Sequence, residues 1–239
     1  MPIQQMMLGS GGAEVEKGSV YFNADENLHV SGGSMQVYNW DSNQSFCIEA
    51  WINMYEMSRY NYIALRWDGN HARIWRFGVS NGNRLFMEGN VSSTQSSATM
   101  TTDTWYHVAC VREGTNQGYS NYLRLYINGT LVQSDSGNGS SMESNTCPIS
   151  IGANAESTNY SMRGYISNLR ITNNEPVYTS NFTPSTTPLT TSSQVSSSAN
   201  VRLLCCQSPD DVTATAHAQS GSLSIDNGTP TASSESPFS

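Results

Sequence analysis

Short runs of β-branched and aromatic residues, separated by turns, occupy most of this chain. In residues 46–54, apolar residues at even positions alternate with Cys47, Glu49, Trp51 and Asn53, a period of two that predicts a strand with one face in a core. Asp-Gly or Asn-Gly pairs at 68–69, 81–82 and 128–129 predict hairpin turns. We expect further strands at residues 18–22, 28–30, 62–67, 72–79, 84–88, 105–112, 122–128, 130–133, 149–152, 164–171, 201–206 and 222–225. This pattern predicts an all-β fold, an antiparallel β-sandwich of two sheets, and leaves the jelly roll and other sandwich topologies open.

The composition limits the partners of such a fold. Charged residues make up 13% of the chain, the net charge is −8, and Lys17 is the only lysine. Nucleic-acid binding depends on clustered cations, so we expect no nucleic-acid partner. No apolar run approaches the roughly 20 residues of a membrane span, so we expect no membrane partner. Residues 1–9 lack a basic start and a long apolar stretch, and we expect no signal peptide there.

The predicted strands suggest one main domain with polar extensions. We expect residues 1–17 to form an N-terminal arm and residues 18–239 a single jelly-roll domain. Within it, residues 183–200 are rich in Ser, Thr and Pro and form a surface segment, which either wraps the domain or links it to a partner. Residues 201–239 supply the closing strands.

The five cysteines have no metal-ligand spacing, and we expect buried free thiols. Cys205 and Cys206 are adjacent. If both lie on one strand, their side chains point to opposite faces and are poor disulfide partners.

Six of the predicted strand segments, in order, resemble the concanavalin A-like jelly roll in its laminin-G-like branch. The resemblance covers about residues 18–172 and implies that fold. The matching segments are residues 18–22, 46–52, 105–109, 123–129, 149–153 and 164–171.

The ends of the chain resemble jelly-roll proteins of marine tailed bacteriophages. The similar segments are residues 1–9, 177–184, 188–189, 201–208, 227–230 and 236–238. This second resemblance implies a virion structural protein on the exterior of the particle, assembled in the host cytoplasm. Its expected partners are capsid or tail subunits, and we expect a homo-oligomer.

Some relatives of the concanavalin A-like fold hydrolyse glucans with two carboxyl groups about 5 Å apart. Glu49 has no acidic neighbour at positions 47, 51 or 53, and Glu56 falls on the opposite strand face. We therefore interpret Glu49 as a strand residue held by hydrogen bonds. His107 lies within a motif of the resembled family, with no nucleophile motif nearby, and we interpret it as a framework residue. We expect no catalytic residues and no enzyme.

Laminin-G-like relatives often bind calcium at the rim of the sandwich. Asp25, Asp68 and Asn70 are the candidate ligands here, but no dense carboxylate loop surrounds them. We expect no metal or other cofactor.

A candidate binding patch lies between residues 55 and 76, where aromatic side chains stand beside amide, carboxylate and guanidinium groups. Sugar sites use this mixture, and so do protein interfaces. A third interpretation places Trp67 and Trp75 in the core on paired strands. The candidate residues are Tyr55, Arg59, Tyr60, Tyr62, Trp67, Asp68, Asn70, His71 and Arg76.

These observations support two functional hypotheses. The first is a non-enzymatic virion surface protein that decorates the capsid or forms a head appendage, with the N-terminal arm and residues 183–200 contacting neighbouring subunits. The alternative is a tail-fibre or tail-tip adhesin that binds host surface polysaccharide.

Overall fold

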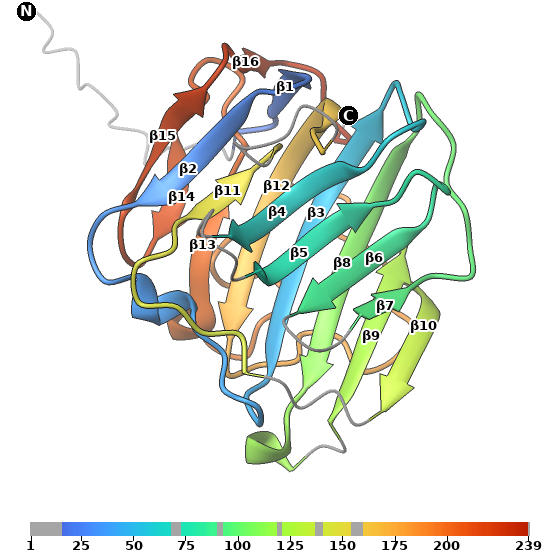
Figure 1. The fold of residues 1–239 in the computed structure, drawn as a ribbon, viewed down its shortest axis with the longest axis vertical. Helices are drawn as coiled ribbons and strands as arrows, with labels where there is room; N and C mark the ends of the chain where they lie inside the picture. Colours follow the sequence, from blue (N-terminus) through green and yellow to red (C-terminus); the bar gives the residue numbers. More distant parts are fainter. Residues whose placement is uncertain are drawn as a thin grey trace, which may run out of the picture.

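The computed structural model describes residues 16–67, 73–89, 93–118, 121–136, 141–153 and 160–238. Their strands form two antiparallel sheets, which we call sheet A and sheet B. In Figure 1 the strands of sheet B cross in front of those of sheet A. The predicted all-β two-sheet antiparallel sandwich is confirmed.

Sheet A has nine strands. β12 lies near its middle and pairs with β1 along its first half and with β13 along its second half. In spatial order the sheet contains β10 (Thr130–Ser136), β9 (Tyr122–Ile127), β8 (Trp105–Glu113), β3 (Phe46–Met54), β12 (Arg163–Asn173), β1 (Ser19–Asn23) and β16 (Thr231–Ser233), while β13 (Val201–Cys205) pairs with β12 and with β14 (Thr215–Ala218).

Sheet B has seven strands. In spatial order they are β15 (Ser222–Asn227), β2 (Asn27–Ser31), β11 (Ile149–Ile151), β4 (Asn61–Trp67), β5 (Arg73–Val79), β6 (Leu85–Gly89) and β7 (Ser93–Gln95). Short 3-10 turns cover Met35–Tyr38 (η1), Thr115–Gln117 (η2) and Ser198–Asn200 (η3). Among the described residues, no helix is long and apolar enough to cross a membrane.

The inward faces of the two sheets enclose one large hydrophobic cluster. The alternation predicted for residues 46–54 is confirmed, because Phe46, Ile48, Ala50 and Ile52 are fully buried in this cluster on β3. Burial of such side chains stabilises the sandwich by roughly 1.5–3 kcal/mol each. The strands β7, β14 and β16 were not predicted, because their sequences, STQ, TAHA and TAS, carry little apolar pattern.

The predicted turns differ in detail. At 128–129 both residues have positive φ, 48° and 75°, as the Asn-Gly pair predicts. In the turn near 81–82 the left-handed residue is Asn83, with φ 61°. The Asp-Gly pair at 68–69 lies outside the described residues.

Residues 174–200, which we call the wrapping segment, run across the outward face of sheet A. Tyr178 packs there against buried residues of β3, β8 and β9, while Leu189 packs against Val201 and Leu204. Asn168, with φ 54°, lies within β12 where the register against β3 shifts, and its side-chain oxygen accepts a hydrogen bond from the backbone N–H of Leu189 at 2.7 Å. The wrapping segment therefore packs its buried side chains on its own sheet, which confirms the alternative that residues 183–200 wrap the domain. Contact of this segment with neighbouring subunits stays a prediction.

All five cysteines are free and buried, as predicted. The argument about Cys205 and Cys206 needs a correction. β13 ends at Cys205, and Cys206 has a left-handed φ of 62°, so the two side chains do not alternate across a strand. Both lie in the main core, with their sulfur atoms 3.6 Å apart.

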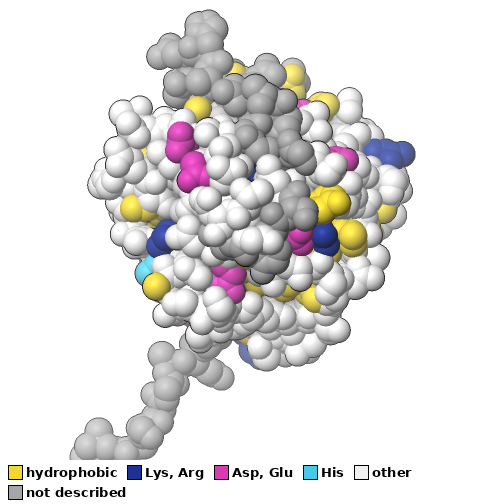
Figure 2. Space-filling view, turned by 90° about the horizontal axis from the view of Figure 1, so that it is seen from below, with side chains coloured by type: hydrophobic (Ala, Val, Ile, Leu, Met, Phe, Trp, Pro, Cys, Tyr) yellow, Lys and Arg dark blue, Asp and Glu magenta, His cyan; other side chains and the backbone are white. Residues whose placement is uncertain are grey.

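Charged side chains are sparse on the surface. Figure 2, seen from below, shows a few acidic and basic side chains, with small hydrophobic areas, among atoms of other side chains and the backbone. This agrees with the 13% of charged residues in the chain and gives the visible face no broad patch of one sign.

Candidate functional site

Glu49 forms a buried polar cluster beneath the wrapping segment. Its Oε1 accepts hydrogen bonds from Nε and Nη2 of Arg170 at 2.8 and 2.6 Å. Its Oε2 accepts one from the hydroxyl of Tyr178 at 2.7 Å and lies 3.1 Å from Nε2 of His107. Arg170 also donates to the backbone oxygens of Thr190 and Ser193, so the cluster ties the wrapping segment to sheet A.

The electrostatics of this cluster suit a structural anchor. Burial by itself raises the pKa of the Glu49 carboxyl, but the positive charge of Arg170 and the hydrogen bonds from His107 and Tyr178 outweigh it and lower the pKa to about 2. The carboxylate therefore stays ionised and paired. The prediction that Glu49 is a strand residue held by hydrogen bonds is confirmed, and His107 is fully buried beside it.

Further along the same face of sheet A, the surface is open and hollowed. A hollow of about 440 Å³ has two half-buried tryptophans in its wall, Trp51 from β3 and Trp105 from β8. Its polar wall includes the turn residue Asn128, together with Ser185 and Thr186 of the wrapping segment. The remaining lining residues are Pro184 and Pro237.

Asn128 is an exposed polar residue in the wall of this hollow. Its side-chain oxygen already accepts a hydrogen bond from the backbone N–H of His107 at 2.9 Å. No described residue accepts a hydrogen bond from its amide nitrogen or pairs with the hydroxyl of Thr186, and both side chains are exposed. The hollow thus combines apolar ring faces with unpaired polar groups, the usual composition of a small-molecule site.

A row of aromatic rings leads away from the hollow across sheet A. Tyr21, Tyr165, Asn53 and Trp105 are successive partners on β1, β12, β3 and β8, and all four face outward because their strand neighbours lie in the core. Ring centroids are 6.0 Å apart between Trp105 and Tyr165, although Asn53 stands between them in the register. The two rings therefore lean toward each other over Asn53.

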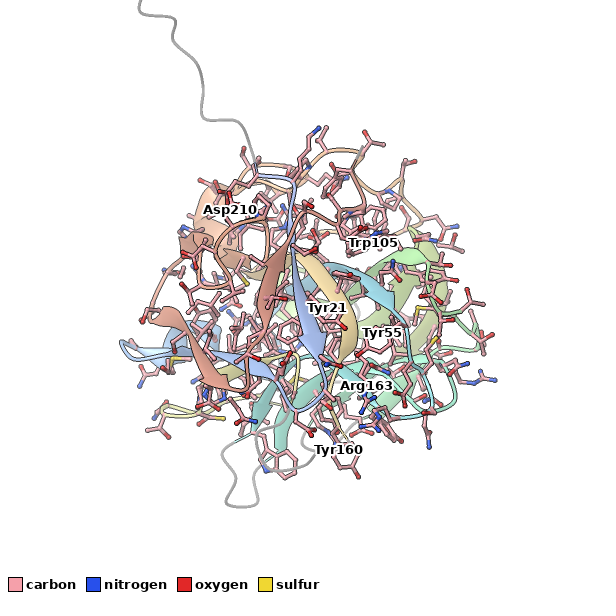
Figure 3. The ribbon with its side chains drawn as sticks, turned by 90° about the horizontal axis from the view of Figure 1, so that it is seen from above. Tyr21, Tyr55, Trp105, Tyr160, Arg163 and Asp210 are labelled. Carbon is pink, nitrogen blue, oxygen red and sulfur yellow. The ribbon has the colours of Figure 1, made fainter. Side chains whose placement is uncertain are left out.

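The row continues to Tyr55, just beyond the end of β3. The centroids of Tyr165 and Tyr21 are 5.0 Å apart, and those of Tyr21 and Tyr55 are 6.0 Å apart. Figure 3 shows Tyr21 and Tyr55 together with Arg163 beside them, and Trp105 further along. Burial and the adjacent Tyr21 raise the pKa of Tyr55 to about 12, so this tyrosine stays neutral in ordinary buffers. We call Trp105, Tyr165, Tyr21 and Tyr55 the aromatic row.

The residues predicted as one patch occupy two regions. Tyr55 belongs to the aromatic row on sheet A, and Arg59 pairs with Glu56 at 3.4 Å. On the outward face of sheet B, Tyr60 and Trp67 pack around Tyr62, whose hydroxyl accepts a hydrogen bond from Arg76 at 2.5 Å, and Arg76 also pairs with Glu88. Trp75 is a core residue, whereas Trp67 is half-buried outside the core. Asp68, Asn70 and His71 lie outside the described residues.

The structure describes one of the three candidate calcium ligands, Asp25. Asp25 accepts a hydrogen bond from the hydroxyl of Ser161 at 3.3 Å, while Asp68 and Asn70 lie outside the description. Among the described residues, no group of three or more acidic, histidine or cysteine side chains could hold a metal ion.

Comparison with known proteins identifies the family. Residues 21–176 match the family described as the concanavalin A-like lectin/glucanases superfamily, in its laminin-G-like form. The chain belongs to this superfamily. It therefore has a lectin-like jelly-roll fold, as the first resemblance implied.

Two solved structures illustrate how this superfamily member compares. A putative carbohydrate-binding protein from Bacteroides ovatus is 14% identical with a TM-score of 0.61, and the match covers 91% of this chain and 62% of that one. A SAP-like pentraxin from Limulus polyphemus is 15% identical with a TM-score of 0.50, covering 67% of this chain and 77% of that one. At these identities the likeness concerns the fold alone. A search of curated proteins gave no match.

Sequence reasoning missed the hollow and most of the aromatic row. The alternation in residues 46–54 placed Trp51 on the face opposite the core, and the resemblance included Trp105 in one of its segments, but neither observation made the two residues neighbours. The sequence did show one tryptophan on each of two clearly predicted strands. Their pairing required the register of β3 against β8, which places Trp51 opposite His107 and Trp105 opposite Asn53.

Proposed function

We propose that this chain is a carbohydrate-binding protein that holds its ligand, without cleaving it, at the hollow between Trp51 and Trp105. The observation that carries the proposal is the pair of half-buried indole rings beside two exposed polar groups without a partner among the described residues, the amide nitrogen of Asn128 and the hydroxyl of Thr186. The C–H faces of a sugar pack on aromatic rings, and its hydroxyls need fixed polar partners. The fold that this chain shares with the putative carbohydrate-binding protein from Bacteroides ovatus supports this choice.

The absence of cleavage is part of the proposal. No described residue that lines the hollow carries a carboxyl group, and retaining hydrolysis requires two of them about 5 Å apart. Glu49, the nearest outward-facing acid on β3, is fully buried and paired with Arg170. A carboxylate held in this way is unavailable to donate a proton to a glycosidic oxygen.

The virion location remains a prediction that rests on the resemblance of the chain ends. Residues 1–15 lie outside the described part, so the structure adds nothing about an N-terminal arm. Of the two roles proposed for a phage particle, attachment to host polysaccharide uses the hollow, whereas capsid decoration does not require it. We therefore place the adhesin role ahead of decoration.

A glycan array followed by titration calorimetry tests the proposed function. The wild-type chain should bind at least one glycan, and Trp105→Ala should weaken that binding at least tenfold, because an aromatic contact and its buried apolar area are lost. Tyr122→Ala is the matched control, since Tyr122 is a half-buried aromatic residue at the other end of sheet A, under Arg124. Wild-type chain that binds no glycan would contradict the proposal, as would equal binding by Trp105→Ala.

A further inference from the structure

We infer that the aromatic row is an extended subsite for a single, twisted chain of a neutral polysaccharide that enters from the hollow. This inference rests on the proposed function and specifies the class of its ligand. Trp105 belongs to both regions, because it lines the hollow and begins the row. The row is therefore continuous with the proposed site.

The length of the row indicates a polymeric ligand. Its four half-buried rings follow one another at centroid distances of 6.0, 5.0 and 6.0 Å across β8, β12 and β1 to Tyr55. One ring can pack against one sugar face, so the row takes about four sugar units in addition to any in the hollow. A single terminal sugar would leave most of these rings uncovered.

The tilt of the rings distinguishes a free chain from a flat crystalline surface. Adjacent planes differ by 41° between Trp105 and Tyr165, by 50° between Tyr165 and Tyr21, and by 24° between Tyr21 and Tyr55. Rings with these tilts cannot all lie flat on one plane. They suit a ligand whose successive sugar faces rotate along its axis.

The charges beside the row favour a neutral ligand. Arg163 lies beside Tyr55 and pairs with Glu56 at 2.7 Å, and Glu56 also pairs with Arg59 at 3.4 Å. Glu235 lies near Tyr165 on the segment that follows β16. Burial is the main cause of the raised pKa of Tyr165, and the negative charge of Glu235 raises it further. These two arginines and two glutamates balance in charge, so the row offers an acidic polysaccharide no net attraction.

The polar groups along the row match the hydroxyls of such a chain. The half-buried Asn53 stands between Trp105 and Tyr165 in the strand register, and its side-chain amide makes no hydrogen bond with the described residues. Asn23 accepts a hydrogen bond from Tyr55 at 2.8 Å, which fixes the far ring of the row. Fixed rings lose little conformational freedom on binding.

Calorimetry with oligosaccharides of two and six units tests the inference. The probes are cello-, malto- and β-1,3-gluco-oligosaccharides, with alginate as an anionic polymer and microcrystalline cellulose as a flat surface. In one neutral series the six-unit chain should bind at least tenfold more tightly than the two-unit chain. Tyr21→Ala and Tyr165→Ala should each weaken six-unit binding about fivefold to tenfold and leave two-unit binding unchanged. Trp105→Ala should weaken both.

Controls separate a lost ring from a damaged fold. Tyr21→Phe keeps the ring and should keep six-unit affinity, and Tyr122→Ala should match wild type in binding. Equal affinities for two and six units, or tighter binding to alginate or crystalline cellulose, would overturn the inference. If Trp105→Ala alone weakens binding, the proposed function stands and the inference fails. If none of the neutral oligosaccharides, the polymers and the glycans of the array binds, the proposed function fails as well.

Discussion

The outward face of β3 contains two regions that differ in what covers them. Cys47 and Glu49 are fully buried beneath the wrapping segment, while Trp51 and Asn53, on the same face, are half-buried beside the hollow. The four residues follow the same alternation along the strand. Whether the wrapping segment covers a position therefore decides whether its side chain stabilises the fold or remains available to bind a ligand.

Charge explains why the two regions contain different side chains. A carboxylate that loses water needs compensating charge and hydrogen bonds, and Glu49 receives these from Arg170, Tyr178 and His107. A half-exposed aromatic ring costs the folded chain little free energy, and covering its apolar surface with a ligand contributes to the free energy of binding. Variants at covered and open positions should therefore differ in stability.

The largest effect is expected from Glu49→Gln. The substitution removes the negative charge and leaves Arg170 buried without its ion-pair partner, so the free energy of unfolding should fall by about 3–5 kcal/mol. Glu56→Gln, which removes a carboxylate paired with Arg163 in the open region, should cost less than about 1 kcal/mol. Urea unfolding followed by tryptophan fluorescence measures both values. Equal losses of unfolding free energy in the two variants would show that burial under the wrapping segment does not distinguish the two carboxylates.

The next effect is an acid-dependent loss of stability in the covered region. The pKa of Glu49 is lowered to about 2 in the folded chain, from its ordinary value of 4.5, which we take for the unfolded chain. The unfolded chain thus binds the proton more readily, and the stabilisation is complete above about pH 5 and lost as the pH falls toward 2. At about 1.36 kcal/mol per unit of pKa, the loss is about 3 kcal/mol.

Urea unfolding at several values between pH 2 and pH 7 measures this dependence. Glu49→Gln cannot titrate at that position, so its stability should fall less steeply with acid than that of wild type. The difference between the two slopes isolates Glu49 from the other carboxyl groups. Parallel slopes would contradict the assignment.

The smallest effect compares the same chemical change in the two regions. Tyr178→Phe removes a hydroxyl that donates to the buried carboxylate of Glu49, and it should cost about 1.5–3 kcal/mol. Tyr55→Phe removes a hydroxyl that donates to the exposed Asn23, and it should cost less than about 0.5 kcal/mol. Thermal unfolding of the two variants side by side gives the comparison. A costlier Tyr55→Phe would reverse our ranking of the regions.

Several features of the fold were predictable from local patterns. The alternation in residues 46–54 indicated the bounds of β3 and the side chains that it buries, because a strand's period of two is visible without its partners. The Asn-Gly pair at 128–129 indicated a turn because these two residue types tolerate the positive φ angles that a tight hairpin turn needs. The left-handed conformations of Asn168 and Cys206 had no comparable signal, since the packing of the wrapping segment and of β13 imposes them.

The candidate site was predictable only in part. Tyr55 was selected from a stretch of aromatic residues, yet its neighbours in space, Tyr21 and Tyr165, come from strands far away in the sequence. The other half of the predicted patch, Tyr60, Trp67 and Arg76, lies on sheet B. Sequence proximity grouped residues that a change of sheet between β3 and β4 separates.

The sequence by itself determined the all-β sandwich, the inward face of β3 and the superfamily, because these depend on local periodicity and on ordered motifs. Only the tertiary structure decided which outward positions are covered. Pairing of β1, β12, β3 and β8 aligned the aromatic row, and the path of the wrapping segment buried Glu49 while leaving Trp51 and Trp105 beside an open hollow. The register of the strands and the burial of sheet A by the wrapping segment depend on contacts between residues far apart in the chain, and no local sequence pattern contains these contacts.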